Sequence, residues 1–262
     1  MAPDLVFTVC LMVAQRGVGV RASDPVARVR YDDGSEREFG LDRLRPVDFG
    51  DSVPWRRVRS RHGQAHYSGS YASATMGGFV VYESRLELAR LLLADFDQDV
   101  RGIYAQPFLL VARVNGRVRR HVPDFLLVSE VGTARLVNVK PAVRLRDPEV
   151  AAALAWPGVL AEWRGWEYEV WSGADVTVLD NIRFLAGYRR PGVVAAGQAE
   201  RALGLVGDGV RLADAEARLA GGRPRHEARP VLLALLWSGR LVTDLTRPLS
   251  GESVLRRPAW PA

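Results

Sequence analysis

The stretch HVPDFLLVSEVGTARLVNVKPA (residues 121–142) contains two apolar runs separated by a polar turn around Gly132. Apolar runs of this length, bounded by proline, glycine and polar residues, are typical of β-strands. We therefore expect strands over 121–129 and 134–139, joined as a hairpin. The order of the surrounding elements depends on this hairpin.

Polar side chains stand where the two expected strands would meet. Side chains alternate between the faces of a strand, so Asn138 and Lys140 should share one face while Val139 points to the other. The hairpin would bring Asp124 close to the Asn138–Lys140 pair. Asp124 could instead be a turn residue after Pro123, and Asn138 could be an edge or turn residue.

Lys140 is the only lysine in a chain with thirty-six basic residues. Arginine is a planar, permanently charged group, whereas lysine is a compact point charge that can lose its proton when buried. A single retained lysine could be chance or codon bias. It could also mark a position beside a scissile phosphate that arginine cannot fill, and its neighbours favour that interpretation.

The elements around the hairpin follow from hydrophobic spacing. Apolar residues at helical spacing predict a helix over 82–97, and a further strand is expected over 102–114 with a turn at Asn115-Gly116. Downstream we expect a helix over 147–164 that Pro157 kinks or breaks, a strand over 166–171 and a helix over 178–188. The order from residue 82 is α-β-β-β-α-β, an α/β (α+β) fold class.

The two ends of the chain differ from this middle part. A β-hairpin with a turn at Asp33-Gly34 is expected over 27–41, followed by a polar loop or irregular arm over 58–80. Helices are expected over 199–205, 212–219 and 230–238, with a short strand in 240–245, which resembles a small winged-helix-like unit. The expected organisation is an N-terminal extension (1–24), a β-hairpin and basic arm (25–80), a central domain (81–190) and a helical C-terminal domain (195–262).

Charge and composition limit the class of protein. The net charge is +6 and the pI is about 10, so a polyanionic partner is expected. Residues 101–146 hold eight arginines and Lys140 against Asp124 and Glu130, a net charge of +7. Cys10 is the only cysteine, which fits a reducing compartment. No segment is long and apolar enough to suggest a membrane span, so we expect a cytoplasmic protein that binds nucleic acid rather than membrane.

The polar residues of the middle part suit phosphodiester hydrolysis. Glu87 on the first helix could join Asp124, Asn138 and the Val139 carbonyl as hard oxygen ligands, which suit Mg²⁺, with Mn²⁺ as a substitute. Such an ion activates water and neutralises charge on phosphate, and the Lys140 ammonium would add electrostatic stabilisation. Glu83 competes with Glu87 as the helix ligand, and Glu87 could instead pair with Arg90 on the helix surface.

The segments YESRLELARLLLADFD, YAQPFLLV, PDFLLV and VNVKPA, taken in this order, resemble the TnsA family. TnsA proteins are the nuclease subunits of heteromeric cut-and-paste transposases and belong to the PD-(D/E)xK, restriction-endonuclease-like superfamily. The similarity covers about residues 80–190. It implies a restriction-endonuclease-like α-β-β-β-α-β core and a C-terminal winged-helix-like domain.

The resemblance implies roles for individual residues. Glu87 and Asp124 match metal-binding and catalytic carboxylates, and Lys140 matches the catalytic lysine. Asn138 stands where the superfamily has Asp or Glu and TnsA has Gln, which weakens the expected metal site. Gln106 matches a glutamine on the first strand. It is grouped with three residues expected to support the site or contact DNA, namely Arg119, Arg120 and His121, although His121 is at least as plausible as a buried structural histidine.

The activity implied is Mg²⁺-dependent endonucleolytic cleavage of DNA at transposon ends. In the family this subunit cuts the strand that its partner leaves intact, so the implied partners are a DDE-type transposase (TnsB-like) and an AAA+ regulator (TnsC-like). Two other functions remain open from the sequence. One is a non-catalytic DNA-binding assembly factor on a nuclease fold, and the other is a stand-alone restriction or repair nuclease.

Overall fold

The computed structural model describes residues 22–56, 67–190, 194, 196–206, 209–222 and 225–258. These residues form two compact units, one reaching Asp95 and continuing over Asp99–Gly173, the other comprising Phe96–Gln98 and the chain from Ala174 onward. The segment 1–21 with Cys10, most of the basic arm (57–66) and the side chain of His226 lie outside the described residues. Among the described residues no helix combines the length and apolarity needed to cross a membrane.

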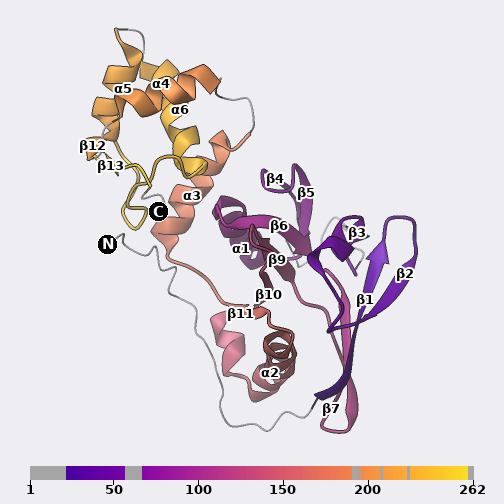
Figure 1. The fold of residues 1–262 in the computed structure, drawn as a ribbon. Coiled ribbons are helices and arrows are strands. Elements are labelled where there is room, and N and C mark those ends of the chain that lie inside the picture. Colours follow the sequence, from indigo (N-terminus) through magenta and orange to yellow (C-terminus); the bar gives the residue numbers. More distant parts are fainter. Residues whose placement is uncertain are drawn as a thin grey trace. The chain divides into compact units, whose positions relative to one another are not determined.

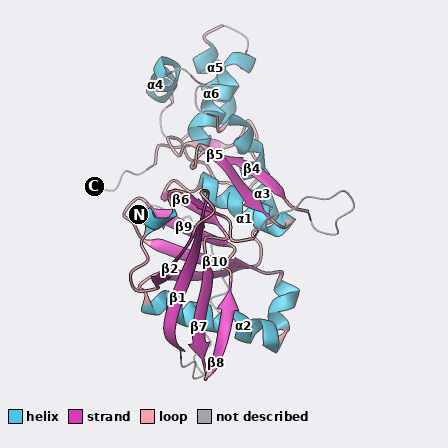
Figure 2. Cartoon of the chain, turned by 90° about the vertical axis from the view of Figure 1, so that its right-hand side faces the viewer, coloured by secondary structure: helices cyan, strands magenta, loops and turns pink. Residues whose placement is uncertain are grey.

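The larger unit contains a mostly N-terminal antiparallel sheet with the order β2-β1-β7-β8, and a short strand, β3, beside β1. Its strands are β1 (Ala22–Tyr31), β2 (Glu36–Gly40), β3 (Ser52–Val53), β7 (Leu109–Val114) and β8 (Arg117–His121). Figure 2 shows β1, β7 and β8 side by side. The expected hairpin at the N-terminus is confirmed, because β1 pairs with β2 across a turn in which Gly34 has φ 82°.

A second, four-stranded sheet in the same unit has the order β11-β10-β9-β6. Its strands are β6 (Val100–Ala105), β9 (Phe125–Ser129), β10 (Ala134–Val139) and β11 (Glu167–Trp171). Helix α1 (Arg85–Phe96) precedes β6, and helix α2 (Pro148–Trp163) connects β10 to the parallel strand β11 (Figure 1). The elements of this sheet therefore follow the expected order α-β-β-β-α-β in a mixed α/β fold.

The expected single strands over 102–114 and 121–129 are each divided between the two sheets. The first run breaks at Gln106, which has a left-handed backbone (φ 47°), so that β6 and β7 belong to different sheets. The second run breaks before Asp124, which separates β8 from β9. Pro107 and Pro123 lie at the two breaks, and proline has no N–H to contribute to a strand ladder.

The two helices cover opposite faces of the four-stranded sheet. Arg90 of α1 bonds Glu169 on one face of β11, and the neighbouring residue Tyr168 lies against α2 on the other. A Cβ atom at Gly158 would approach Tyr168 Cδ1 to 2.8 Å, so glycine permits the close packing of α2 on β11. The helix continues through Pro157, and the expected break there does not occur.

The main core of this unit lies between the two sheets and α2. Its largest members come from all three layers and include Phe49, Phe108, Leu110, Leu126, Leu136, Trp156 and Trp166. Burial of each such side chain contributes roughly 1.5–3 kcal/mol to the free energy of unfolding. The core thus fixes the ends of β8, β9 and β10, where the candidate site lies.

The prediction of a loop over 58–80 is wrong for its described part. Strands β4 (Gly69–Ser73) and β5 (Gly78–Tyr82) pair as a hairpin that the buried carboxylate of Asp95 holds in place. The donors to Asp95 are Tyr71 Oη (2.8 Å), Ser73 Oγ (2.5 Å), Ala74 N (3.0 Å) and Thr75 N (2.8 Å). Polar residues that suggested a loop instead bond one carboxylate from α1.

The smaller unit is mainly helical. Its elements are α3 (Val176–Leu185), α4 (Ala196–Leu205), β12 (Val210–Arg211), α5 (Leu212–Ala220), α6 (Arg225–Trp237) and β13 (Val254–Leu255). Strands β12 and β13 pair antiparallel, and Val242 forms a single bridge with Arg256 where a short strand was expected. Helix α6 starts five residues before Pro230, earlier than the sequence suggested.

The boundary between the two units also differs from the expected one. The sequence placed α3 in a domain ending at residue 190, whereas the compact units divide after Gly173. The buried Asn181 of α3 explains the difference, because its amide donates to the carbonyls of Leu245 (2.9 Å) and Arg247 (2.7 Å) and accepts from Leu249 N–H (2.9 Å). These bonds tie α3 to the C-terminal segment.

Candidate active site

Asp124 is held in place by main-chain contacts to the neighbouring strands. Its N–H donates to Val137 O (3.0 Å), and its side-chain Oδ2 accepts a 2.6 Å hydrogen bond from Val139 N–H. The Asp124 carbonyl accepts from Gln106 N–H at 2.9 Å. The other carboxylate oxygen, Oδ1, has no hydrogen-bond donor among the residues that the structure describes.

Lys140 follows directly on β10, and its own N–H donates to Trp171 O at 2.9 Å. Asp124 precedes β9 and Lys140 follows β10, and because these strands are antiparallel neighbours both residues lie at the same end of the sheet. The positive charge of Lys140 acts on the Asp124 carboxyl. The sequence therefore placed these two residues together correctly.

Glu87 lies in the first turn of α1, and its carboxylate bonds the two residues just before the helix. Ser84 Oγ accepts from Glu87 N–H (3.0 Å) and donates to Glu87 Oε1 (3.0 Å), while Glu87 Oε2 accepts from Glu83 N–H (2.7 Å). This arrangement is close to a capping box, in which a serine and a glutamate three residues later satisfy the free N–H groups of the first turn. Glu87 thus has a capping role, which leaves lone pairs on both oxygens for a further ligand.

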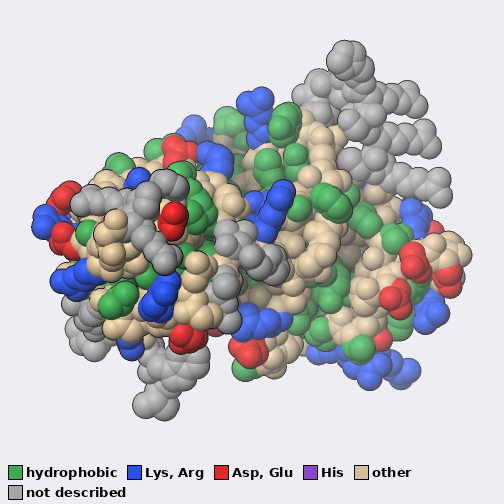
Figure 3. Space-filling model, turned by 90° about the horizontal axis from the view of Figure 1, so that it is seen from above, with side chains coloured by type: hydrophobic (Ala, Val, Ile, Leu, Met, Phe, Trp, Pro, Cys, Tyr) green, Lys and Arg blue, Asp and Glu red, His purple; other side chains and the backbone are tan. Residues whose placement is uncertain are grey.

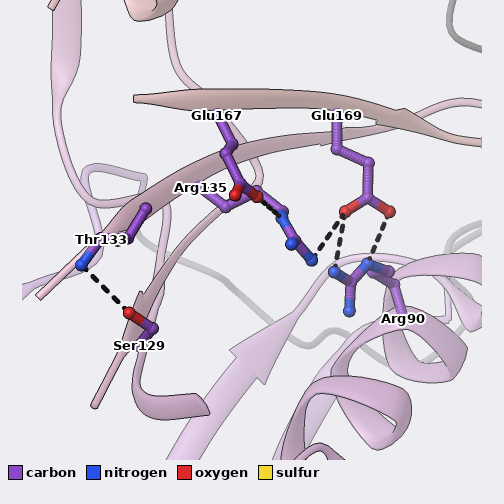
Figure 4. A network of polar contacts seen from close by, with 6 residues as sticks. All are labelled: Arg90, Ser129, Thr133, Arg135, Glu167 and Glu169. Atoms are coloured by element: carbon purple, nitrogen blue, oxygen red, sulfur yellow. Dashed lines mark hydrogen bonds and ion pairs between the residues drawn. The ribbon is translucent and has the colours of Figure 1, made fainter. Parts of the chain in front are cut away.

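The alternative pairing of Glu87 with Arg90 does not occur. Arg90 instead forms a two-pronged ion pair with Glu169 of β11, at 3.0 Å and 2.9 Å, in which both side chains are largely buried. Figure 4 shows this pair, with Arg135 also approaching Glu169 and bonding Glu167. The pair fixes α1 on the sheet one turn after Glu87 and so determines where that carboxylate lies.

Both carboxyl groups have raised pKa values, and the charge of Asp124 acts on Glu87. Burial raises the pKa of Glu87, the hydrogen bond from Glu83 N–H opposes that rise, and the charge of Asp124 adds to it. Burial also raises the pKa of Asp124, against the charge of Lys140, the bond from Val139 and the charge of Arg56. A bound cation would stabilise the ionised form of both groups, so the environment of these carboxyl groups favours the binding of a cation.

Asn138 does not point its amide oxygen at these carboxylates. Its Oδ1 accepts a 2.6 Å bond from His121 Nε2, and its Nδ2 donates to Tyr168 Oη at 3.1 Å, while Tyr168 Oη donates to Leu154 O at 2.6 Å. Asn138 is 1% exposed. Oδ1 and Nδ2 each have a partner in a buried network against α2, and the role of Asn138 as a metal ligand stays a prediction.

His121 belongs to the same network and not to an open phosphate contact. Its ring packs edge-on against Trp156 at a centroid distance of 6.1 Å. Burial lowers the pKa of His121 to about 4, the bond to Asn138 opposes this, and the charges of Lys140 and Arg56 add to it. The imidazole is therefore neutral at pH 7, and the structural interpretation of this histidine is the better one.

Gln106 is buried and supports the site through three bonds. Its N–H donates to Asp124 O (2.9 Å), its carbonyl accepts from Trp55 N–H (2.9 Å), and its Oε1 accepts from Arg56 N–H (3.1 Å). Arg56 in turn pairs with Glu83 at 3.0 Å. Glu83 is thereby occupied by Arg56, which makes Glu87 the better candidate for the helix ligand.

The basic segment 101–146 divides into paired and unpaired residues. Arg101 pairs with Glu130, and Arg135 pairs with Glu167. In the described part of the chain, no acidic partner is found for the exposed residues Arg117, Arg119, Arg120, Arg144 and Arg146. Basic side chains are spread over the face visible in Figure 3, interspersed with hydrophobic ones.

The carboxylates of Glu87 and Asp124 are the candidate ligands for a divalent cation, and this role stays a prediction. The described residues contain no cluster of three or more His, Cys, Asp or Glu side chains placed to hold a metal. Glu87 and Asp124 supply two carboxylates, and Mg²⁺ is commonly bound by one or two carboxylates together with water and substrate phosphate. Whether the Val139 carbonyl is a ligand stays a prediction, since only the Val139 N–H has an assigned partner at the site.

Comparison with known proteins adds no relative. No protein-family model matches the chain, and no curated protein matches it.

Two features of the site were missed from sequence. Arg56 counted only as one member of a basic run, and Tyr168 counted only as a strand residue, because their partners Gln106 and Asn138 are far away in the chain.

Proposed function

We propose that this chain is a Mg²⁺-dependent DNA endonuclease, the TnsA-like subunit of a heteromeric transposase, which hydrolyses phosphodiester bonds at transposon ends. The observation that carries the proposal is the placement of Asp124 and Lys140 at one end of adjacent strands, with Glu87 coupled to Asp124. Two carboxylates and a lysine ammonium are the groups that phosphodiester hydrolysis requires.

The order of elements supports the same proposal. The sequence α1, β6, β9, β10, α2, β11, with β10 and β11 parallel, agrees with the core that the TnsA resemblance implies. In the smaller unit, the order α4, β12, α5, α6, bridge, β13 resembles a winged helix, in which the last strand lies between the other two: β13 pairs with β12, and the adjoining Arg256 pairs with Val242. Fold similarity alone would not assign function, so the site residues have to carry it.

The residues that would hold the ion are Glu87 and Asp124, the latter through its Oδ1 atom. A bound Mg²⁺ would lower the pKa of a water molecule and neutralise charge on the phosphate, and Mn²⁺ would substitute for it. Asn138 would act indirectly, as a positioning residue, because its network with His121 and Tyr168 fixes β10 against α2. A rigid β10 keeps Lys140 in register with Asp124.

The chain's own cations would bind and orient the DNA. The ammonium of Lys140 would lie beside the non-bridging oxygens of the scissile phosphate and stabilise developing negative charge. Exposed arginines of β8, including Arg119 and Arg120, would contact the phosphate backbone next to the site. The TnsB-like and TnsC-like partners follow from the same proposal, as the proteins that would select the transposon end.

The test is a Mn²⁺ titration combined with nicking of supercoiled plasmid. Asp124→Asn replaces the carboxylate by an amide whose oxygen can still accept from Val139 N–H, so the fold is retained. Asp42→Asn is the matched control, because Asp42 is exposed. We expect loss of Mn²⁺ binding and of nicking for Asp124→Asn alone. Equal Mn²⁺ binding by Asp124→Asn and the unaltered chain would refute the nuclease proposal.

A second candidate function is a DNA-binding assembly factor without catalysis. The bonding of the Asn138 amide in a buried network favours it, because Asn138 Oδ1 bonds His121 instead of lying free for a metal. This function predicts that the unaltered chain binds DNA but no Mn²⁺. The same titration therefore separates the two candidates.

A further inference from the structure

The segment that carries Arg56 is held rigidly against the sheet that bears Asp124. Gln106 accepts both consecutive N–H groups of this segment, from Trp55 (2.9 Å) and from Arg56 (3.1 Å). On its other side, Arg30 donates to Trp55 O at 2.6 Å and its guanidinium stacks 4.5 Å from the centre of the Trp55 ring. The Arg56 backbone is thus fixed from two directions.

Gln106 links this segment directly to the candidate site. It adopts a left-handed backbone (φ 47°), which residues other than glycine rarely adopt. The same residue donates its N–H to Asp124 O at 2.9 Å. One buried residue therefore joins the main chains of Arg56 and Asp124, through its side-chain Oε1 to Arg56 and through its own N–H to Asp124.

The side chain of Arg56 is joined to the other carboxylate as well. Its Nη1 lies 3.0 Å from Glu83 Oε2, and Glu83 N–H donates to Glu87 Oε2 at 2.7 Å. Arg56 is 49% exposed and Glu83 is 30% exposed. An ion pair this open is weak, so an incoming phosphate can displace Glu83.

The charges around Asp124 suit a phosphodiester only when Arg56 is present as a second protein cation beside Lys140. The groups that act on Asp124 and Glu87 are Glu83, Lys140 and Arg56. Together with the two carboxylates they carry a formal charge of −1, which a divalent cation changes to +1. That value complements the single negative charge of a phosphodiester, and without Arg56 the site would be neutral.

We propose that Arg56 binds a DNA phosphate at the Asp124–Lys140 site, and that it does so by exchanging its ion pair with Glu83 for a two-pronged contact to phosphate oxygens. The planar guanidinium suits such a contact. This inference rests on the proposed nuclease function, since it takes DNA as the substrate. Glu83 then keeps the guanidinium oriented while no DNA is bound.

The test compares Arg56–Glu83 with Arg101–Glu130, an exposed ion pair of 2.9 Å on the same unit. The affinity for a fluorescein-labelled DNA duplex is measured by fluorescence anisotropy in Ca²⁺ at several salt concentrations. We expect Arg56→Ala to weaken binding about tenfold more than Arg101→Ala and to reduce the salt slope by about one. Arg56→Lys should recover the salt slope but only part of the affinity.

The exchange itself is tested from the acidic side. Glu83→Gln should tighten DNA binding more than Glu130→Gln, because it releases Arg56, and this extra gain should vanish in the Arg56→Ala background. Thermal unfolding of each variant verifies that the fold is retained.

Equal affinities and salt slopes for Arg56→Ala and Arg101→Ala would overturn the phosphate contact. A gain from Glu83→Gln that persists without Arg56 would overturn the exchange. Neither result touches the Mn²⁺ and nicking test of Asp124→Asn. Conversely, failure of that test would leave any Arg56-dependent DNA affinity as a measured fact, so the two failures are distinguishable.

Discussion

Asp124 Oδ2 accepts a 2.6 Å hydrogen bond from the main-chain N–H of Val139, which joins the candidate metal ligand of one strand to the residue before Lys140 on the next. The bond gives Asp124 two separable roles. One is charge, which only the carboxylate supplies, and the other is acceptance of a buried N–H, which an amide oxygen can also provide.

These two roles predict different results for two substitutions. Asp124→Asn should abolish DNA cleavage with a change of less than about 1 kcal/mol in the free energy of unfolding. Asp124→Ala should abolish cleavage and also lower that free energy by about 1–3 kcal/mol, because Val139 N–H loses its acceptor. Urea unfolding of both variants provides the comparison. Equal stabilities would show that the bond contributes nothing.

Lys140→Arg tests the preference for lysine at the only position where the chain has one. The charge is retained, but the larger planar group cannot occupy the position of an ammonium beside the phosphate. We expect the single-turnover cleavage rate to fall at least about 100-fold while duplex affinity changes little. Arg144→Lys, at an exposed position a turn further on, is the control. Full activity of Lys140→Arg would exclude a catalytic lysine.

The Arg90–Glu169 pair is predicted to hold α1 on the sheet. Arg90→Met leaves Glu169 largely buried with only Arg135 nearby, at 3.9 Å, and should lower the free energy of unfolding by about 3–5 kcal/mol. The double variant Arg90→Met/Glu169→Met removes both charges and should regain most of that loss. Chemical denaturation measures both. A double variant no more stable than Arg90→Met would contradict this account.

His121 predicts a pH dependence of stability. Its pKa is about 4 in the folded chain and about 6.5 when unfolded, so the unfolded chain binds the extra proton between these values. The contribution of the neutral imidazole is complete above pH 6.5 and is lost as the pH falls toward 4, by about 3 kcal/mol in total.

The variant that isolates this effect is His121→Gln, which does not titrate but can still donate to Asn138 Oδ1. Free energies of unfolding at pH 7.5 and pH 5 should differ less for His121→Gln than for the unaltered chain. Identical pH dependence in the two proteins would mean that His121 is protonated without penalty in the fold.

Asp95 is predicted to keep the β4–β5 hairpin closed. Asp95→Asn turns one acceptor oxygen into a donor, which then faces two of the four donors: Tyr71 and Ala74 at Oδ2, or Ser73 and Thr75 at Oδ1. Hydrogen exchange at Tyr71–Thr75 should then accelerate by at least about tenfold, because several charge-assisted bonds are lost. Exchange in β9, none of whose described residues forms a hydrogen bond with Asp95, is the internal reference. Unchanged exchange in the hairpin would show that strand pairing alone suffices.

Local chemistry was enough to predict several elements of the fold. The turn at Asn115-Gly116 is an example, since both residues adopt positive φ values (49° and 78°) that asparagine and glycine tolerate. The hairpin of β9 and β10 and the joint position of Asp124 and Lys140 follow in the same way. They depend on side-chain alternation within strands that are close together in the chain.

Tertiary packing decided the rest, because the deciding partners are far apart in the chain. Asn138 carries an amide that suits either a metal or a buried network, and only the tertiary structure places His121 of β8 and Tyr168 of β11 against it. Likewise, the left-handed turn at Gln106 divides one predicted strand between two sheets, and the buried side chain of this residue bonds Arg56 N–H next to the site. A pattern of alternation records which face a residue occupies, but the group it meets there depends on how the sheets and helices pack.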